Sequence, residues 1–331
     1  MTLIPRFLVH ARTAVPSSKP GPTASDNPFA GQAHRRILIT GGTGFIGKTT
    51  VRHMLDVGHA VTILSRNPLR AARAFEGRAR AVGSLEELSA DDIFDGVINL
   101  AGAPVVGPPW TASRRATLVA SRMGTTEALM TWLHRARHKP AVWIQASAIG
   151  AYGVRAPDES LDENSATGTA FMSRLCLDWE AAAKPALDMG VRQVVLRFGL
   201  VFGRGGALPP MLLPYRLGLG ATLGDGKQVM SWIHHDDVIR LIAYALDHES
   251  MRGIYNAVAP EAVAQSAFAK TVADTLKRPL FLRLPAAPLR MLTGEMGQLF
   301  LDGQRVVPMR LIQHGFTFRF PTLAAAISNL T

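Results

Sequence analysis

Three glycines stand at regular intervals between an apolar run and a helical stretch. The run extends from Ile37 to Thr40, and Gly41, Gly44 and Gly47 follow it in a G-x-x-G-x-x-G pattern. Glycines at this spacing permit a tight turn, close approach of the backbone to a pyrophosphate, and close packing of a helix. Free N–H groups and the positive end of the helix dipole then face the phosphates. Because glycine-rich turns also serve structural ends, the pattern predicts a dinucleotide site only in a strand–turn–helix context.

A hydroxyl and a guanidinium occupy the position that determines whether such a site prefers NAD or NADP. A second apolar strand is expected at Ala60 to Leu64, and Ser65 and Arg66 follow it, with Ser65 18 residues beyond Gly47. An acidic residue near this distance suits a free 2′-hydroxyl, whereas an arginine suits a 2′-phosphate. Both side chains can donate to a dianion, the arginine through a planar fork. The pair favours NADP (NADPH) over NAD, the alternative being an ordinary surface arginine after a strand.

The composition is that of an enzyme-sized chain. Its 331 residues, 47% of them hydrophobic, suffice for one large α/β domain or two smaller ones. A single cysteine, Cys176, excludes an intrachain disulfide framework and fits a reducing compartment. No apolar run approaches membrane-spanning length. The net charge of +11 raises nucleic acid as a partner, but the arginines are scattered and lack interleaved aromatics, so this class is the least favoured.

Residues 1–34 form a segment of distinct composition. They are rich in Pro, Ser, Thr and Gly, and carry Arg6, Arg12 and Lys19 ahead of the first acidic residue, Asp26. We expect a flexible basic extension. It is compatible with an organelle transit peptide, which would place the protein in an organelle matrix, and equally with an unstructured leader on a cytoplasmic protein.

Beyond residue 66, short apolar strands alternate with longer helical stretches, as in a doubly wound parallel sheet of the Rossmann type. Strands are expected within 96–104, 141–153 and 191–206, and a helix over 110–138 capped by Thr111 or Ser113. The carboxyl ends of parallel strands meet at one edge, where ligands bind. That edge collects Asn99 to Ala103, Ser147, Tyr152, and Arg197 to Gly206.

Six stretches stand out in order along the chain: TGGTGFIG (40–47), NLAGAPV (99–105), SRMGTTEAL (121–129), QASAIGAYG (145–153), SWIHHDDV (231–238) and GQRVVPMRLIQHGFTFRFPTL (303–323). Together they resemble an extended short-chain dehydrogenase/reductase, more narrowly the atypical NAD-dependent-epimerase-like proteins with a C-terminal domain of unknown function. The resemblance implies a Rossmann domain over 35–203, to which later segments return, and a smaller substrate domain mainly over 204–331. It implies an NADP-dependent oxidoreductase or epimerase acting on a nucleotide-sugar or other polar carbonyl compound. A homodimer is compatible with it.

The resemblance and the strand ends together imply the residues that hold the cofactor. They are Gly41, Thr43, Gly44, Phe45, Ile46, Gly47, Ser65, Arg66, Leu100, Ala101, Gly102, Ala103, Ala146, Phe198, Gly199 and Leu200.

The acid–base residues of the wider family are missing from their places in this chain. The family uses a Ser or Thr, a Tyr-x-x-x-Lys pair and often an Asn, and the matching positions hold Ala148, Met172, Cys176 and Ser121. Neither Met nor Ala can transfer a proton. This departure keeps a second class open, a non-catalytic NADPH-binding regulatory or scaffold protein.

Five other residues are candidates for the substitute roles. Ser147 and Tyr152 are the candidate catalytic groups, although a tyrosine at a strand end often only packs. Arg204 could hold an anionic substrate group, and His234 could line the substrate site with Trp232, although a buried structural histidine is equally well supported. No metal site is expected, because adjacent histidines such as those at 234 and 235 diverge. The lone cysteine is interpreted as a small core residue.

Overall fold

A seven-stranded parallel sheet forms the centre of the molecule. The computed structural model describes residues 26–331, and at residues 289, 290, 292, 293, 299 and 300 the backbone alone. The spatial order of the strands is β12-β7-β5-β4-β1-β2-β3, with the direction of strand addition reversing between β1 and β4. This order is that of the doubly wound dinucleotide-binding fold, so the predicted fold class is confirmed. In chain order, the strands are β1 (Arg36–Thr40), β2 (Ala60–Leu64), β3 (Arg80–Val82), β4 (Gly96–Asn99), β5 (Val142–Ala148), β7 (Arg192–Phe198) and β12 (Gly253–Ala257).

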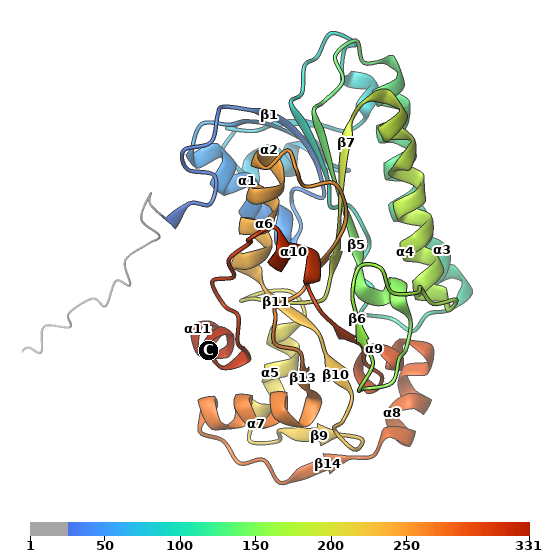
Figure 1. Cartoon of the computed structure of the whole chain (residues 1–331), viewed down its shortest axis with the longest axis vertical. Coiled ribbons are helices and arrows are strands. Elements are labelled where there is room, and N and C mark those ends of the chain that lie inside the picture. Colours follow the sequence, from blue (N-terminus) through green and yellow to red (C-terminus); the bar gives the residue numbers. More distant parts are fainter. Residues whose placement is uncertain (1–25) are drawn as a thin grey trace, which may run out of the picture.

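Both faces of the sheet are buried, which is why its strands are continuous apolar runs. In β1, Ile37 and Ile39 join the core on one face while Leu38 joins the core on the other. Figure 1 shows α3 and α4 on one face and α1 and α6 on the other. The helices that accompany the sheet are α1 (Phe45–Asp56), α2 (Pro68–Ala74), α3 (Ala112–Arg135), α4 (Phe171–Ala183) and α6 (His235–Asp247), with the 3₁₀ helices η2 (Leu85–Glu87), η3 (Ile149–Tyr152) and η4 (Lys184–Met189).

The long helix α3 begins as the sequence predicts. Thr111 is its N-cap, and the side chain of Thr111 accepts a hydrogen bond from the backbone N–H of Arg114 at 3.2 Å. Of the two predicted caps, Thr111 is therefore the one used, while Ser113 lies inside the first turn.

The later part of the chain supplies a second, smaller layer and also returns to the sheet. Helix α6, strand β12 and helix α10, which packs on β12, lie with the central layer, whereas most of the remaining elements gather beyond its carboxyl edge (Figure 1). Four two-stranded pairs join them: β8 (Leu200–Phe202) with β11 (Trp232–His234), β9 (Ala221–Leu223) with β14 (Leu282–Leu284), β10 (Val229–Met230) with β13 (Val263–Ala264), and β6 (Ser160–Leu161) with β15 (Arg305–Val306). The helices are α5 (Leu208–Arg216), α7 (Gln265–Leu276), α8 (Ala286–Thr293), α9 (Gln298–Leu301), α10 (Met309–Gln313) and α11 (Leu323–Leu330), with η5 (Gly294–Gly297).

Residues 26–34 correct one expectation. The flexible extension was expected to reach residue 34, but Phe29 is fully buried in the core below β1, edge-on to His59 at 6.0 Å between ring centroids. The side-chain amide of Asn27 donates to the carbonyl of His53, and that of Gln32 donates to the carbonyl of Ala243. This stretch contains one large apolar residue among small and polar ones, so its composition gave no sign that it packs on the core. The expectation for residues 1–25 lies outside the described residues, and the division into 35–203 and 204–331 stays a prediction.

The described residues also bear on membrane insertion. No helix within residues 26–331 has the length and apolar character needed to cross a bilayer.

Candidate cofactor and catalytic site

The glycine-rich turn lies at the carboxyl end of β1, against the end of β4. Gly41 has a φ of +69°, and a Cβ on it would lie 2.7 Å from the backbone carbonyl of Leu100. A Cβ on Gly47 would lie 2.2 Å from the carbonyl oxygen of Gly41. Both positions therefore exclude any side chain. Helix α1 starts at Phe45 with Gly44 as N-cap, no side-chain cap and no acidic residue in its first turn, so its positive end is left for an anion.

A buried chain of polar side chains fixes the strand ends around this turn. The Thr40 hydroxyl donates to Oδ1 of Asn99 at 2.6 Å, and Nδ2 of Asn99 donates to Thr126 at 2.9 Å and to Gln145 at 3.0 Å. These residues come from β1, β4, α3 and β5 and are fully buried. Fully satisfied buried networks hold their members in one arrangement. The sequence analysis missed this network, although polar residues inside apolar strands were a visible signal.

Ser65 and Arg66 lie at the end of β2, as predicted. The backbone N–H of Ser65 donates to the carbonyl of Val82 at 2.9 Å, which holds the turn against β3. Arg66 is exposed, and among the described residues its guanidinium takes part in no ion pair. Asn67 caps α2 directly afterwards, accepting from the N–H of Arg70. The arginine therefore projects from a fixed turn with its donors free for an anion.

Arg122, within the stretch 121–129, is a further site candidate that was not predicted from the sequence. Its guanidinium donates to the carbonyls of Leu118 at 3.1 Å and Ala103 at 3.3 Å, and lies 5.0 Å from the centre of the Trp179 ring. A Cβ on Gly102 would lie 3.0 Å from its Cζ. Burial lowers the pKa of Arg122, and among the described carboxylates none lies within ion-pair distance. A cation without a carboxylate thus flanks the end of β4.

Ser147 belongs to a buried charged cluster. Its hydroxyl donates to Oε1 of Glu180 at 2.6 Å, and Arg197 donates to both oxygens of that carboxylate at 2.8 Å. The side chains of Arg197 and Glu180 are 3% and 10% exposed. Burial opposes the charge on Arg197, but the hydrogen bonds and the negative charge of Glu180, together with Tyr152, outweigh it and raise the pKa of the guanidinium. The arrangement orients Ser147 and commits its hydrogen to the carboxylate.

Tyr152 lies inside the protein rather than at an open edge. It is fully buried, its hydroxyl donates to Oδ1 of Asn256 at 2.7 Å, and Arg197 lies over its ring at 4.9 Å. Burial raises the pKa of Tyr152 above its ordinary value of 10, although Arg197 offsets part of the rise. Its surroundings are those of a packing residue that links η3 to β12.

The positions of the missing acid–base pair are apolar in the structure as well. Met172 and the thiol of Cys176 face Gly150, where a Cβ would meet Met172 and the sulfur at 3.7 Å. Burial, reinforced by Glu180, raises the pKa of Cys176 to about 11, so its thiol stays neutral. A thioether and a weakly acidic thiol therefore stand at these two positions of α4.

The three predicted substrate residues differ in their exposure, and two of them, Trp232 and His234, share strand β11. Arg204 is exposed on the glycine-rich turn after β8. Trp232 is fully buried and stacks on Phe202 at 5.6 Å. His234 is 1% exposed, stacks on Phe320 at 3.9 Å, and its Nδ1 accepts from the N–H of Asp236 as the cap of α6. Burial lowers the pKa of His234 to about 4, so it is a neutral structural residue.

His235 is the histidine that approaches the cofactor turn. Its ring lies 4.5 Å from that of Phe45, and its Nε2 is 3.2 Å from the carbonyl oxygen of Phe45. The same phenyl ring contacts Gly203, Gly205 and Gly206 where side chains would clash with it. The two adjacent histidines point apart, as their adjacency predicts.

Comparisons with known proteins identify the family. The model of the "NAD dependent epimerase/dehydratase family" matches residues 37–257, and "Domain of unknown function (DUF1731)" matches residues 284–330. "Epimerase family protein SDR39U1" of Mus musculus is 37% identical over 300 residues, covering 89% of this chain and 99% of its own. "Epimerase family protein YfhF" of Bacillus subtilis is 35% identical, covering 89% and 97%. An Arabidopsis thaliana relative named "SDR39U1 homolog, chloroplastic" is 32% identical, covering 89% and 86%.

Solved structures agree with the family match. The crystal structure of the human epimerase family protein SDR39U1 (isoform2) with NADPH superimposes with a TM-score of 0.80 at 33% identity, covering 89% of this chain and 98% of that chain. A nucleoside-diphosphate sugar epimerase from Corynebacterium glutamicum gives a TM-score of 0.73 at 28% identity, covering 92% and 61%. The resemblance inferred from six short stretches is confirmed.

Proposed function

The chain belongs to the NAD dependent epimerase/dehydratase family, and we propose that it binds NADPH in preference to NADH and acts as an epimerase-like oxidoreductase on a small carbonyl compound. The observation that carries the cofactor preference is Arg66, which stands unpaired at the end of β2 where NAD sites hold an acidic residue. The human relative whose structure was solved with NADPH supports the same choice.

Each part of the proposed cofactor site has a defined donor. The N–H groups at the start of α1 would receive the pyrophosphate, because the Gly41 and Gly47 contacts leave room for backbone alone. Ser65 and Arg66 would receive the 2′-phosphate. Arg122, which lies beside the end of β4 and against Trp179 of α4, would donate to the nicotinamide half. When bound, the cofactor supplies a hydride.

The proton for such a reaction has no evident source at the family's positions. Met172 has no proton to transfer, burial raises the pKa of the Cys176 thiol to about 11 and makes it a weak acid, and Ser147 already donates its hydrogen to Glu180. General acid–base help typically contributes about 10²–10⁴ in rate, so we expect slow turnover of ordinary sugars, aldehydes and ketones. A nucleotide-sugar or another polar carbonyl compound stays the proposed substrate class. The departure from the family's acid–base residues at Ala148, Met172 and Cys176 is what favours the second candidate, a non-catalytic NADPH-binding protein.

Calorimetric titration with NADPH and NADH tests the cofactor assignment. Arg66→Ala should weaken NADPH by about 1.5–3 kcal/mol, the value of a charged hydrogen bond, and leave NADH nearly unchanged. Arg70→Ala, which removes another exposed arginine one turn into α2, is the matched control and should change neither. Equal losses for both cofactors would refute the 2′-phosphate assignment.

The nicotinamide half is tested separately through Arg122. Arg122→Gln should weaken NADPH but leave adenosine 2′,5′-bisphosphate unaffected, since this fragment lacks the nicotinamide half. Arg66→Ala should weaken both. A loss of fragment binding in Arg122→Gln would place Arg122 at the adenosine end instead.

Turnover separates the enzyme from the non-catalytic candidate. NADPH absorbance followed across a panel of sugars, aldehydes and ketones should show slow oxidation for an enzyme without its usual acid, and none for a binding protein. Oxidation at about 10 s⁻¹, the median of ordinary enzymes, would contradict the expectation of slow turnover.

The proposed function also has implications for where the protein is located and how it assembles. We propose a cytoplasmic protein, with an organelle matrix as the alternative that the name of the Arabidopsis relative keeps open. A homodimer stays a proposal, and nucleic acid is not among the proposed partners.

A further inference from the structure

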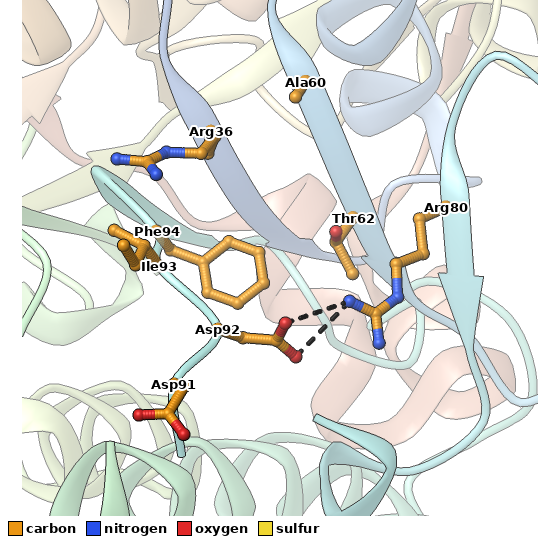
Figure 2. Close-up of a pocket in the computed structure, with 8 residues that line it drawn as sticks. All are labelled: Arg36, Ala60, Thr62, Arg80, Asp91, Asp92, Ile93 and Phe94. Atoms are coloured by element: carbon orange, nitrogen blue, oxygen red, sulfur yellow. Dashed lines mark hydrogen bonds and ion pairs between the residues drawn. The ribbon is translucent and has the colours of Figure 1, made fainter. Parts of the chain in front are cut away.

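Two surface cavities lie at the amino end of the central sheet, opposite the cofactor edge, and they differ in how their arginines are paired. The first, of about 370 Å³, surrounds the starts of β1, β2 and β3 (Figure 2). In it Arg80 pairs with Asp92 at 3.3 Å, as the dashed lines in Figure 2 show, and Arg36 pairs with Asp95 at 2.9 Å. Its positive charges are balanced by neighbouring carboxylates, so we do not expect this cavity to attract an anion.

The second cavity has a different lining. It has a volume of about 390 Å³ and lies at the start of β12, between that strand and α10. It is lined by Ser250, Arg252, Tyr255, Arg310, Gln313 and His314. The side chains that line it therefore include two guanidinium groups, two hydroxyls, an amide and an imidazole, and no carboxylate.

The cations of this cavity are not ion-paired. Among the described residues, no carboxylate oxygen lies within 4.0 Å of the guanidinium of Arg252 or Arg310. The same holds for Arg192, which is buried next to the cavity. Arg192 donates to the carbonyls of Ala245 and Met251. Burial and then the charge of Arg252 lower the pKa of Arg192, while Glu249 opposes the shift. The charge of Arg252 therefore acts on Arg192, and the Glu163 carboxylate accepts from the backbone N–H of Arg310 rather than from its guanidinium.

The guanidinium of Arg310 and the hydroxyl of Tyr255 are held in place before any ligand arrives, whereas the exposed guanidinium of Arg252 makes no described hydrogen bond. Arg310 donates through Nη1 to the carbonyl of Ile254 at 3.1 Å and through Nη2 to Oδ1 of Asn164 at 3.3 Å. An arginine carries five N–H donors, so several remain for a ligand. The Tyr255 hydroxyl accepts from the backbone N–H of Arg252 at 3.2 Å and lies 3.0 Å from Nε2 of His314. Fixed donors lose less conformational entropy on binding.

We propose that this cavity is a second ligand site, which binds the phosphate group of a small phosphate monoester between Arg252 and Arg310. Planar guanidinium forks match phosphate oxygens, and two of them around one cavity favour a dianion. The volume lies within the range of small-molecule sites, about 300–1,000 Å³, and exceeds what a bare phosphate ion fills. The site is separate from the cofactor edge by the length of β12, roughly 16 Å for its five residues.

Titration calorimetry with phenyl phosphate tests the proposal. The protein is first saturated with NADPH, which fills the phosphate sites at the cofactor edge. Arg252→Gln should weaken phenyl phosphate about tenfold or more, as loss of one charged hydrogen bond predicts. Arg252 is exposed and its side chain supports no other described contact, so this variant should fold normally. Arg80→Gln, in the balanced cavity, is the matched control and should bind like the unaltered protein.

Three outcomes would overturn the proposal: no binding of phenyl phosphate at about 10 mM, an affinity unchanged in Arg252→Gln, or an equal loss in Arg80→Gln. Inorganic phosphate should bind more weakly than phenyl phosphate, and equal affinity would refute the monoester assignment. If NADPH itself does not bind, the proposed function fails, but the same titration on the Arg66→Ala protein still measures this cavity.

Discussion

Ser147 donates its hydroxyl hydrogen to Glu180 at 2.6 Å, and the accepting carboxylate is itself held by both branches of Arg197. A serine in this arrangement presents its lone pairs, not its proton, to any other partner. The residue nearest to the family's serine position is therefore an acceptor, supported by a charge pair that is almost completely buried.

This charge pair should dominate the local stability. Glu180→Gln leaves the Arg197 cation buried without its anion, and removing one partner of a buried pair costs about 3–5 kcal/mol. Urea unfolding measures the loss. Asp178→Asn, an exposed carboxylate on the same helix, should change the free energy of unfolding by no more than about 0.5 kcal/mol. A loss below about 1 kcal/mol in Glu180→Gln would show that the pair is not the support described here.

Tyr152→Phe should act on stability rather than on chemistry. It leaves the buried Oδ1 of Asn256 without its donor, which costs about 1–3 kcal/mol. NADPH affinity, followed by calorimetry, should stay unchanged. If instead the variant unfolds like the unaltered protein and abolishes a rapid turnover, Tyr152 is the proton donor.

Phe29→Ala should destabilise the protein by about 3–5 kcal/mol, because a fully buried phenyl ring is lost from the core below β1. Deletion of residues 1–34 should cost at least as much, whereas deletion of residues 1–25 should leave the melting temperature within a few degrees. Leu69→Ala, whose side chain is 74% exposed, is the control and should be nearly neutral. An unchanged melting temperature in Phe29→Ala would show that residues 26–34 do not stabilise the core and belong to the expected flexible extension.

Acidification should destabilise the fold through His234. Burial lowers its pKa from the ordinary 6.5 to about 4, so between these pH values the unfolded chain binds a proton that the folded protein does not. The stabilisation is complete above pH 6.5 and is lost as pH falls towards 4, by up to about 3 kcal/mol. His53 and His59, whose pKa values burial also lowers, act in the same direction.

Urea unfolding at pH 7.5, 6 and 5 measures this slope. His234→Asn keeps a side-chain acceptor for the cap of α6 and should flatten it. An equal slope in both proteins would assign the acid sensitivity to other groups.

The fold was predictable because its signals are local. β1 and β2 alternate with a glycine turn and a helix over about 30 residues, and the expected strand at Ala60–Leu64 matches the observed one. The cofactor edge follows from parallel topology, since the ends of β4, β5 and β7 must meet there. The residues at that edge could therefore be predicted, because they directly follow each strand in the sequence.

The catalytic and substrate residues were harder to place because burial is not a local property. Tyr152 follows a strand, but its burial depends on Asn256, which is 104 residues away. His234 likewise depends on Phe320 for its apolar contact. Phe29 lies among residues typical of loops, and only the core below β1 explains its place. The pairing of Glu180 with Arg197 required knowledge of which strand lies under α4.

Strand β12, the last strand of the central sheet in chain order, makes the nucleotide-binding half dependent on residues after 203. β12 is supplied by residues 253–257 and pairs along β7, whose first six residues are buried. A chain that stops at residue 203 would expose the seven residues of β7 as an unpaired edge, and such edges recruit strands from other molecules. The excised half would self-associate through this edge, so intact tertiary architecture here also serves as protection against aggregation.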